Sequence, residues 1–249
     1  MTSTLPQRSP AWHAARRGKL TASNIGAALG LCPWTSRQQA FERALGKESF
    51  VGNEATRWGT ENEPNGILAY TAHTGNYVQS TGLHVHPNIS WLAGSPDGLV
   101  GDVGLIEVKC PYWRKKDGTR VHREVPAHYY MQVNLCLAIT AREWCDFISW
   151  TPEGYAVYRI HTDVALHDAM LPHYSNFFAA MQRGAAKAPP LTKDELESIR
   201  SNVVSSMAKC VDYSFWKNTD PEAPPPSPTT SDDAGNDSLK RKWEFSSDD

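Results

Sequence analysis

Residues 95–111 read SPDGLVGDVGLIEVKCP, and they are the most informative part of the chain. The second half has the composition of a β-strand, in which successive side chains point to opposite faces. Glu107 and Lys109 therefore share one face, while Ile106 and Val108 occupy the opposite, apolar face. An acid and an amine on an otherwise apolar strand are costly to bury without a partner or a task. The pattern thus predicts a buried strand that carries chemistry on one face.

The first half of this stretch supplies a second carboxylate. Asp97 precedes Glu107 by ten residues, with a turn at 102–104 between two short strands, so a hairpin would bring the two carboxylates together. Two carboxylates and the backbone carbonyl of Val108 form a hard oxygen site that suits Mg²⁺. Lys109 would orient a metal-activated water or stabilise charge on a scissile phosphate. The alternative is an ordinary strand with a surface Glu–Lys pair, which the hairpin spacing disfavours.

The spacing Asp97…Glu107-x-Lys109 resembles the PD-(D/E)XK nuclease signature, and the wider pattern resembles the lambda-exonuclease/YqaJ viral recombinase group within it. The agreement in order and spacing covers residues 8–182. The blocks that carry it are WHAARRG at 12–18 with TAS at 21–23, WGTENE at 58–63, GSPDG at 94–98 with EVKCP at 107–111, and YMQV at 130–133. The resemblance implies an α/β (α+β) fold with a restriction-endonuclease-like core, in which helices flank a central mixed β-sheet.

The resemblance also implies roles for matching residues. Asp97 and Glu107 would be metal ligands, together with the Val108 carbonyl, and Lys109 would be the catalytic lysine. Glu63 matches a helix glutamate that acts near the metals and is a further candidate ligand; Glu61, on another face of the helix, is the weaker candidate. The glutamine of the last block, Gln132, matches one on the helix beside the active strands. One or two Mg²⁺ ions, with Mn²⁺ as a substitute, are the implied cofactor.

A second set of matching residues is implied to hold the 5′-phosphate of DNA: Arg16 and Ser23, with Ser95 as a third member. The chemistry is reasonable, since Arg provides bidentate donors and free N–H groups at a helix start attract phosphate. Simple helix capping is the alternative for Ser23 and for Thr21. One departure from the family pattern is Asn134, which stands where a second glutamine is common.

Charge is divided unevenly along the chain. The net charge is −2, but residues 220–249 carry eight acidic and three basic side chains, which leaves +3 for residues 1–219. A basic loop within the folded part contains Arg114, Lys115 and Lys116, which are candidates for DNA-backbone contact with salt-sensitive binding. Scattered surface charge is the alternative. Trp34 and Trp113 are candidates for stacking on bases, although most tryptophans are expected in the core.

The order of elements predicts a mixed sheet with helices on both sides. A nuclease domain is expected at 1–183, a linker and a C-terminal helix at 184–219, and a disordered acidic tail at 220–249. The expected helices begin near residues 21–23, 36, 61, 126, 162 and 192, and the expected strands lie within 77–109 and at 143–150 and 155–161. The helix at 61–73 would hold Pro64 in its first turn, and the last helix would run from 192 to 213.

Several other kinds of protein are disfavoured. No apolar run approaches the ~20 residues needed to cross a membrane, and the N-terminus does not read as a signal peptide. Five widely spaced cysteines are expected to be reduced, which predicts an intracellular protein of the cytoplasm or, given the basic triplet 240–242, the nucleus. A zinc site at His84 and His86 lacks further ligands. Phosphate-binding loops and serine-hydrolase elbows are absent from the sequence.

The combined prediction is a Mg²⁺-dependent nuclease, a 5′→3′ exonuclease on double-stranded DNA that serves viral recombination or DNA processing. Two alternatives stay open: an endonuclease or single-strand nuclease on the same fold, and a non-catalytic DNA-binding protein. The resemblance further implies a single-strand annealing protein as partner and a homo-oligomeric ring that encircles DNA. No membrane partner is expected.

Overall fold

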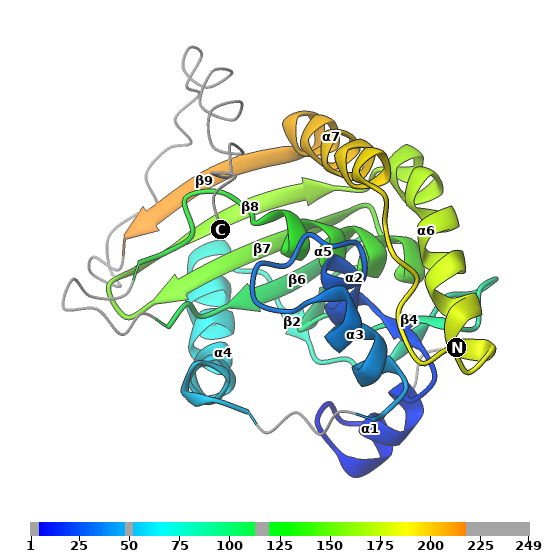
Figure 1. Ribbon diagram of the computed structural model, residues 1–249. Helices are drawn as coiled ribbons and strands as arrows, with labels where there is room; N and C mark the ends of the chain where they lie inside the picture. The colour runs from blue at the N-terminus through cyan, green and yellow to red at the C-terminus, as the bar shows by residue number, and fades with distance from the viewer. Residues whose placement is uncertain (1–4, 48–51, 113–119, 218–249) are drawn as a thin grey trace.

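The computed structural model describes residues 5–47, 52–112 and 120–217. Its centre is a six-stranded sheet in the order β2-β5-β6-β7-β8-β9 (Figure 1). β6 runs parallel to β7, and the other neighbouring strands are antiparallel. The strands are β2 (Val78–Gln79), β5 (Gly98–Val100), β6 (Gly104–Lys109), β7 (Trp144–Thr151), β8 (Gly154–His161) and β9 (Val211–Lys217). The predicted mixed sheet is therefore confirmed.

A smaller sheet of three strands lies beside the first. β4 (Leu92–Gly94) is its middle strand, with β1 (Leu20–Thr21) parallel on one side and β3 (His84–Val85) antiparallel on the other. The parallel pairing of β1 with β4 connects the N-terminal region to the segment just before Asp97. Residues distant in sequence are thereby brought to one end of the main sheet.

Helices cover both faces of the main sheet, each over its own apolar core (Figure 1). α4 (Glu54–Thr74) packs on the face that carries Ile106 and Val108. The opposite face is covered by α2 (Ala22–Ala28), α3 (Arg37–Ala44), α5 (Ala127–Thr140), α6 (Val164–Gln182) and α7 (Lys193–Cys210). The short α1 (Pro10–Arg16) precedes them. Since α5 is buried almost all round, the residues it directs at β6 lie in the protein interior.

Most predicted helix boundaries are confirmed. Ser36 starts α3 with a capping box, Thr192 starts α7 with another, and Pro126 precedes α5. Thr21 is the N-cap residue of α2, although its side chain makes no capping hydrogen bond. Gly30 follows α2 in the left-handed conformation, with a φ of +71°.

Two predicted boundaries are wrong. α4 begins seven residues before the predicted residue 61, because the Asn53 side chain caps it by accepting from the Thr56 N–H at 3.0 Å. Pro64 therefore lies in the middle of a helix of 21 residues instead of in its first turn. α7 ends at Cys210, because the chain there turns into strand β9, which pairs along the edge of β8. The acidic tail and its basic triplet lie outside the described residues.

Candidate active site

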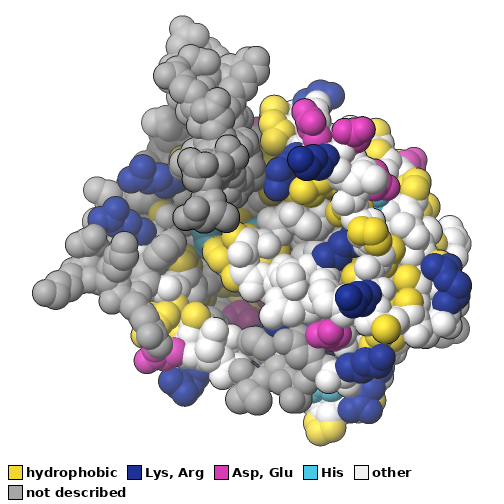
Figure 2. All heavy atoms as spheres, viewed as in Figure 1, with side chains coloured by type: hydrophobic (Ala, Val, Ile, Leu, Met, Phe, Trp, Pro, Cys, Tyr) yellow, Lys and Arg dark blue, Asp and Glu magenta, His cyan; other side chains and the backbone are white. Residues whose placement is uncertain are grey.

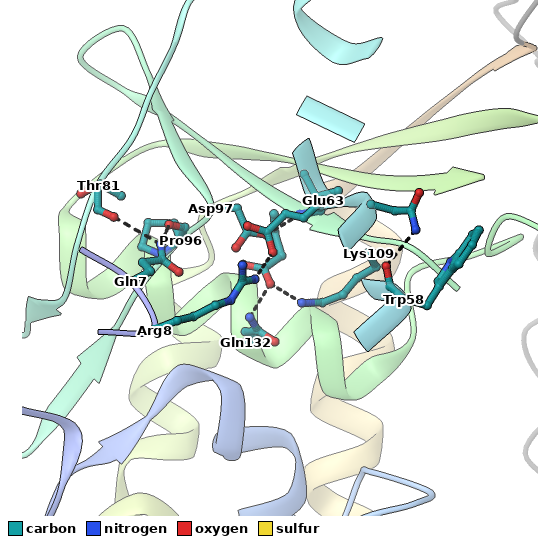
Figure 3. A network of polar contacts seen from close by, with 12 residues as sticks. Gln7, Arg8, Trp58, Glu63, Thr81, Pro96, Asp97, Lys109 and Gln132 are labelled. Atoms are coloured by element: carbon teal, nitrogen blue, oxygen red, sulfur yellow. Dashed lines mark hydrogen bonds and ion pairs between the residues drawn. The ribbon is translucent and has the colours of Figure 1, made fainter. Parts of the chain in front are cut away.

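β6 presents its charged face to α5, as strand alternation predicts. The Glu107 side chain is buried, with 2% of the residue exposed. Its Oε1 accepts hydrogen bonds from both the Lys109 ammonium and the Gln132 amide on α5 (Figure 3). Its Oε2 is also buried and has no hydrogen-bond partner among the described residues. Oε1 of this carboxylate thus accepts two hydrogen bonds, whereas Oε2 accepts none from the described residues.

The hairpin of β5 and β6 brings Asp97 to the same place. Gly98 pairs with Ile106 across the hairpin, and the Asp97 N–H donates to the Ile106 carbonyl at 3.1 Å. The Asp97 Oδ2 accepts from the Val108 N–H at 2.7 Å. The structure therefore places Asp97, Glu107 and Lys109 together around the end of β6, where the sequence spacing predicted them.

The charges of this cluster perturb one another strongly. Burial, and then the negative charge of Glu107, raise the pKa of the Asp97 carboxyl group above its ordinary value. Burial also raises the pKa of Glu107, against the opposing effect of Lys109. For Lys109, burial alone would lower the pKa, but the charges of Glu107 and Asp97 outweigh it and raise the pKa. Burial is thus the largest cause of both raised carboxyl pKa values, and repulsion from Glu107 adds to that of Asp97.

These residues fit a hard divalent cation. The leftover Oε2 of Glu107 lies in a cluster whose excess negative charge a cation would relieve. Among the described residues, no group of three or more His, Cys, Asp or Glu side chains is arranged to hold a metal ion by itself. Mg²⁺ does not require one, because it binds through one or two carboxylates, retains several waters and recruits substrate phosphate.

Glu63 on α4 approaches the cluster from the other side and is held by the N-terminal segment. The Arg8 guanidinium forms an ion pair with its carboxylate, and the charge of Glu63 contributes to the raised pKa of Asp97. Arg8 has a φ of +66°, an unusual conformation for a residue other than glycine. The neighbouring Gln7 amide anchors this turn by donating to the Pro96 carbonyl at 2.8 Å (Figure 3). Sequence analysis missed Arg8 because no local pattern connects it with residue 63.

The residues expected to hold a 5′-phosphate form a second polar group. The Arg16 Nη2 donates to the Ser23 hydroxyl at 2.8 Å and to the Thr21 hydroxyl at 3.2 Å. The Trp12 ring lies under the Arg16 guanidinium, 4.1 Å from its centroid, and the Trp12 Nε1 donates to Ser95 Oγ at 3.0 Å. Arg16, Ser23 and Ser95 are thus brought together. Thr21 and Trp12 are further members of this polar group. The i, i+4 spacing of Trp12 and Arg16 on one helix could have indicated Trp12 from the sequence.

Arg16 is well suited to an anion. Burial lowers its pKa to about 10, partly opposed by Cys136, so the guanidinium remains charged near neutral pH. Among the described residues its partners are two hydroxyl groups and an aromatic ring, so no carboxylate there pairs with its positive charge. The capping alternative for Ser23 is not what the structure shows, because the hydroxyl faces Arg16 and lies inside a helix of seven residues.

A cleft of about 590 Å³ opens beside the carboxylate cluster. It lies between the start of α4, the loop before α3 and the end of β6, and Arg8, Trp34, Glu63, Lys109, Tyr112 and Tyr129 are among its lining residues. Figure 2 shows a hollow near the middle of this face with an acidic side chain inside it. Lys and Arg side chains are spread over this face and form no single patch.

The structure describes only part of the remaining sequence candidates. Trp113, Arg114, Lys115 and Lys116 lie outside the described residues. Asn134 on α5 is 3% exposed, and its Nδ2 has no hydrogen-bond partner among the described residues.

The zinc alternative gains no support. The His84 ring contacts the Thr81 hydroxyl at 2.6 Å, while the His86 Nδ1 accepts backbone N–H groups. Within the described ranges no metal-binding group forms around them. In the same part of the chain, none of the helices is both long and apolar enough to cross a membrane.

Comparisons with known proteins agree with this geometry. The family model of the YqaJ-like viral recombinase domain matches residues 11–143. An alkaline exonuclease from Laribacter hongkongensis is 32% identical, with a TM-score of 0.56, and the match covers 79% of this chain and 99% of that one. The structure of the same enzyme with dAMP matches at 31% identity over 79% and 99%, with a TM-score of 0.57.

Two further proteins match at lower sequence identity. A phage-related exonuclease from Haemophilus somnus shares the fold at 14% identity, with a TM-score of 0.51, over 70% of this chain and 99% of that chain. An uncharacterized protein of Acanthamoeba polyphaga mimivirus is 27% identical over 163 residues, which are 60% of this chain. The chain spans 30% of the length of that viral relative.

Proposed function

Because the chain belongs to the YqaJ-like viral recombinase family, a lambda-exonuclease-like group of PD-(D/E)XK nucleases, we propose that it is a Mg²⁺-dependent DNA exonuclease. It would hydrolyse phosphodiester bonds of double-stranded DNA in the 5′→3′ direction, in viral recombination or DNA processing. The observation that carries the proposal is the cluster of buried Glu107 with half-buried Asp97 and Lys109, in which one Glu107 oxygen has no hydrogen-bond partner among the described residues. A structural ion pair would have no reason to leave that oxygen without a partner.

The proposed metal ligands are Asp97, Glu107 and the backbone carbonyl of Val108. Glu63 is a further candidate ligand, because its charge reaches Asp97. When bound, one or two Mg²⁺ ions would supply an activated water and neutralise charge on the phosphate. Mn²⁺ has the same preference for oxygen ligands and is expected to substitute.

The side chains of Lys109 and Gln132 would stabilise charge and orient the carboxylate. The Lys109 ammonium stays charged, lies over the Tyr129 ring at 4.9 Å and borders the cleft, so it can stabilise negative charge on a phosphate there. Gln132 holds Glu107 in one orientation by donating to its Oε1. Since Glu107 is buried, bulk water is kept from the carboxylate and these charges act in a medium of low polarity.

Direction would be set at the second polar group. Arg16, Ser23 and Ser95 would bind the terminal 5′-phosphate, with Thr21 adding a hydroxyl and Trp12 supporting the guanidinium. A bidentate Arg–phosphate contact provides both energy and orientation. Arg114, Lys115 and Lys116, which lie outside the described residues, stay candidates for contact with the DNA backbone.

A time course on end-labelled linear duplex DNA tests the proposal, with and without a 5′-phosphate, in Mg²⁺ and in a chelator. We expect release of mononucleotides from 5′-phosphorylated ends in Mg²⁺ and none in the chelator. Efficient cutting of closed circular duplex would favour the endonuclease alternative, and faster digestion of single strands would favour the single-strand nuclease. DNA binding without any Mg²⁺-dependent cleavage would favour the non-catalytic alternative. A ring-shaped oligomer and a single-strand annealing partner stay predictions from the family resemblance.

A further inference from the structure

The loop between α2 and α3 carries an unusually exposed tryptophan. Trp34 is 69% exposed, whereas large aromatic side chains normally bury most of their surface. It lines the same cleft as Lys109 and Glu63. An exposed indole at this position has no packing role that would account for it, so a ligand in the cleft is the natural contact.

The loop is fixed at both ends. Near its start, Leu31 donates its N–H to the Gly26 carbonyl at 2.9 Å after the left-handed turn at Gly30. At the other end, Ser36 begins α3 with a capping box, and the Arg43 Nη1 donates to the Thr35 hydroxyl at 3.3 Å. An aromatic ring presented by a fixed backbone loses little conformational entropy when a ligand stacks on it.

The aromatic neighbour of Trp34 is His128. Their ring centroids are 5.3 Å apart and the planes meet at 87°, an edge-to-face contact that steadies the indole. His128 is itself 8% exposed, and its Nε2 finds no hydrogen-bond partner in the part of the chain that the structure describes. It cannot retreat, because the backbone of α2 passes so closely that a Cβ on Gly26 would lie 2.5 Å from the His128 Cβ.

A small cavity connects the surroundings of this tryptophan with the carboxylate cluster. A small cavity of about 40 Å³ is lined by His128 together with Ser23 and Gln132, so it lies between the proposed phosphate-binding group and the carboxylate cluster. Burial, and then the positive charge of Lys109, lower the pKa of His128 to about 4. A neutral imidazole has one donor and one acceptor nitrogen, so the Nε2 of His128 can form one hydrogen bond with a nucleotide.

The combination identifies the class of ligand. The cleft carries cationic side chains, among them Arg8, Arg43 and Lys109, and aromatic rings, among them Trp34 and Tyr129. Cations follow a phosphodiester backbone and aromatic rings stack on bases, so this mixture is typical of a channel for single-stranded nucleic acid. An apolar peptide would not match the cations, and a bare phosphate would not use the indole.

We propose that Trp34, steadied by His128, is a stacking platform for one unpaired nucleobase near the reacting phosphate. The inference rests on the proposed function and deepens it, since it assigns a side chain of the cleft to the base beside the reacting phosphate. The base recognised there is read by its ring face and not by its identity, because every base has a face on which an indole can stack.

The test combines a protein variant with an altered substrate. DNA affinity is measured by fluorescence anisotropy with Ca²⁺ in place of Mg²⁺, and kcat/KM is measured in Mg²⁺. The substrates are 5′-phosphorylated duplexes with a single abasic site at each of the terminal positions of either strand. The variants are Trp34→Ala, Trp34→Phe and, as a matched exposed aromatic outside the cleft, Tyr77→Ala, whose ring belongs to a residue 79% exposed.

For the wild type, we expect one abasic position to lower affinity by about 10-fold, within the roughly 5- to 100-fold range of base stacking. Trp34→Ala should lower the affinity for intact DNA by a similar factor, and an abasic site at that position should not lower the affinity of this variant further. Trp34→Phe should keep most of the affinity. Tyr77→Ala should behave as the wild type does. The circular dichroism spectra and melting temperatures should match in all variants.

The stacking platform would be overturned if, at every abasic position, the loss of affinity caused by Trp34→Ala multiplied with the loss caused by the missing base. A Trp34→Ala variant with unchanged affinity and kcat/KM would overturn it too. In that case the wild type would still digest linear duplex, and the proposed function would stand. If the wild type binds no DNA and cleaves none, the proposed function itself fails and the platform fails with it. Binding without cleavage in Mg²⁺ would remove the nuclease proposal alone, because the anisotropy cycle still reports on stacking.

Discussion

Two buried carboxylates on neighbouring strands have opposite surroundings. Asp146 on β7 is 2% exposed, as is Glu107 on β6. Both oxygens of Asp146 are satisfied: Arg159 donates to each of them at 2.8 Å, and the Tyr70 hydroxyl donates to Oδ2 at 2.7 Å. Glu107 instead has two donors on one oxygen and none, among the described residues, on the other.

Under the proposed function, this difference separates a structural carboxylate from a metal-binding one. Asp146 lies across from Ile106, on the side of the sheet covered by α4, and its bidentate pairing completes the core there. Glu107 lies on the α5 side, next to the half-buried carboxylate of Asp97, and Lys109 is a cation that the two carboxylates share. Buried charges are normally paired, so the incomplete pairing of Glu107 supports the metal site that we propose.

The largest expected effect is on catalysis. Asp97→Ala and Lys109→Ala should each lower the cleavage rate in Mg²⁺ by more than about 10³-fold, because one removes a proposed metal ligand and the other the charge facing the phosphate. A gel assay on end-labelled duplex measures the rate, and circular dichroism checks the fold. Either variant cleaving at the wild-type rate would end the assignment of this cluster as the active site.

The second effect is on stability, and its sign should differ between the two carboxylates. Asp146→Asn should lower the free energy of unfolding by about 2–4 kcal/mol, because it breaks a buried, bidentate pair. Glu107→Gln should leave stability unchanged or raise it when metal is absent, because it removes excess buried charge. Urea denaturation in a chelator measures both. Equal destabilisation by the two variants would mean that Glu107 is structural as well.

A third, smaller effect compares two arginines. Arg159 is paired with a carboxylate, whereas Arg16 is paired with hydroxyl groups and a ring. Arg16→Ala should therefore reduce the preference for 5′-phosphorylated over unphosphorylated ends by about 10-fold, the loss of one charge-assisted contact. The exposed neighbour Arg17 provides the control, as Arg17→Ala should retain the preference. An unchanged preference in Arg16→Ala would place the phosphate elsewhere.

The smallest effect is expected at the N-terminal segment. The Arg8–Glu63 pair is partly open to solvent, and such pairs contribute at most about 1 kcal/mol to stability. Arg8→Ala should thus leave the urea midpoint nearly unchanged and alter kcat/KM only a few-fold, far less than Lys109→Ala. A loss as large as that of Lys109→Ala would make Arg8 part of the catalytic machinery.

Local sequence rules predicted the part of the site that lies within one hairpin. Strand alternation placed Glu107 and Lys109 on one face, and the turn at 102–104 brought Asp97 beside them. The capping box at Thr192 and the end of α2 near Gly30 were likewise local. Family blocks added Arg16 and Ser23, which the structure brings into contact.

Features that depend on distant contacts were not predictable. The pairing of Arg8 with Glu63 joins residues 55 positions apart, and a basic residue in a polar N-terminus carries no mark of its partner. The start of α4 was missed because residues 54–60 contain Gly59 and other weak helix formers, and the Asn53 cap outweighs them. Strand β9 was missed because a strand at a sheet edge is specified by its neighbour β8 as much as by its own sequence.

The central claim is that the incompletely paired carboxylate cluster binds a divalent cation, and thermal unfolding with and without Mg²⁺ tests it most directly. The wild type and Asp146→Asn should both be stabilised in a saturable way, by about 2.7 kcal/mol at 100 times the dissociation constant. Glu107→Gln should show no such gain. Equal Mg²⁺ stabilisation of Glu107→Gln and the wild type, or none in either, would contradict the claim.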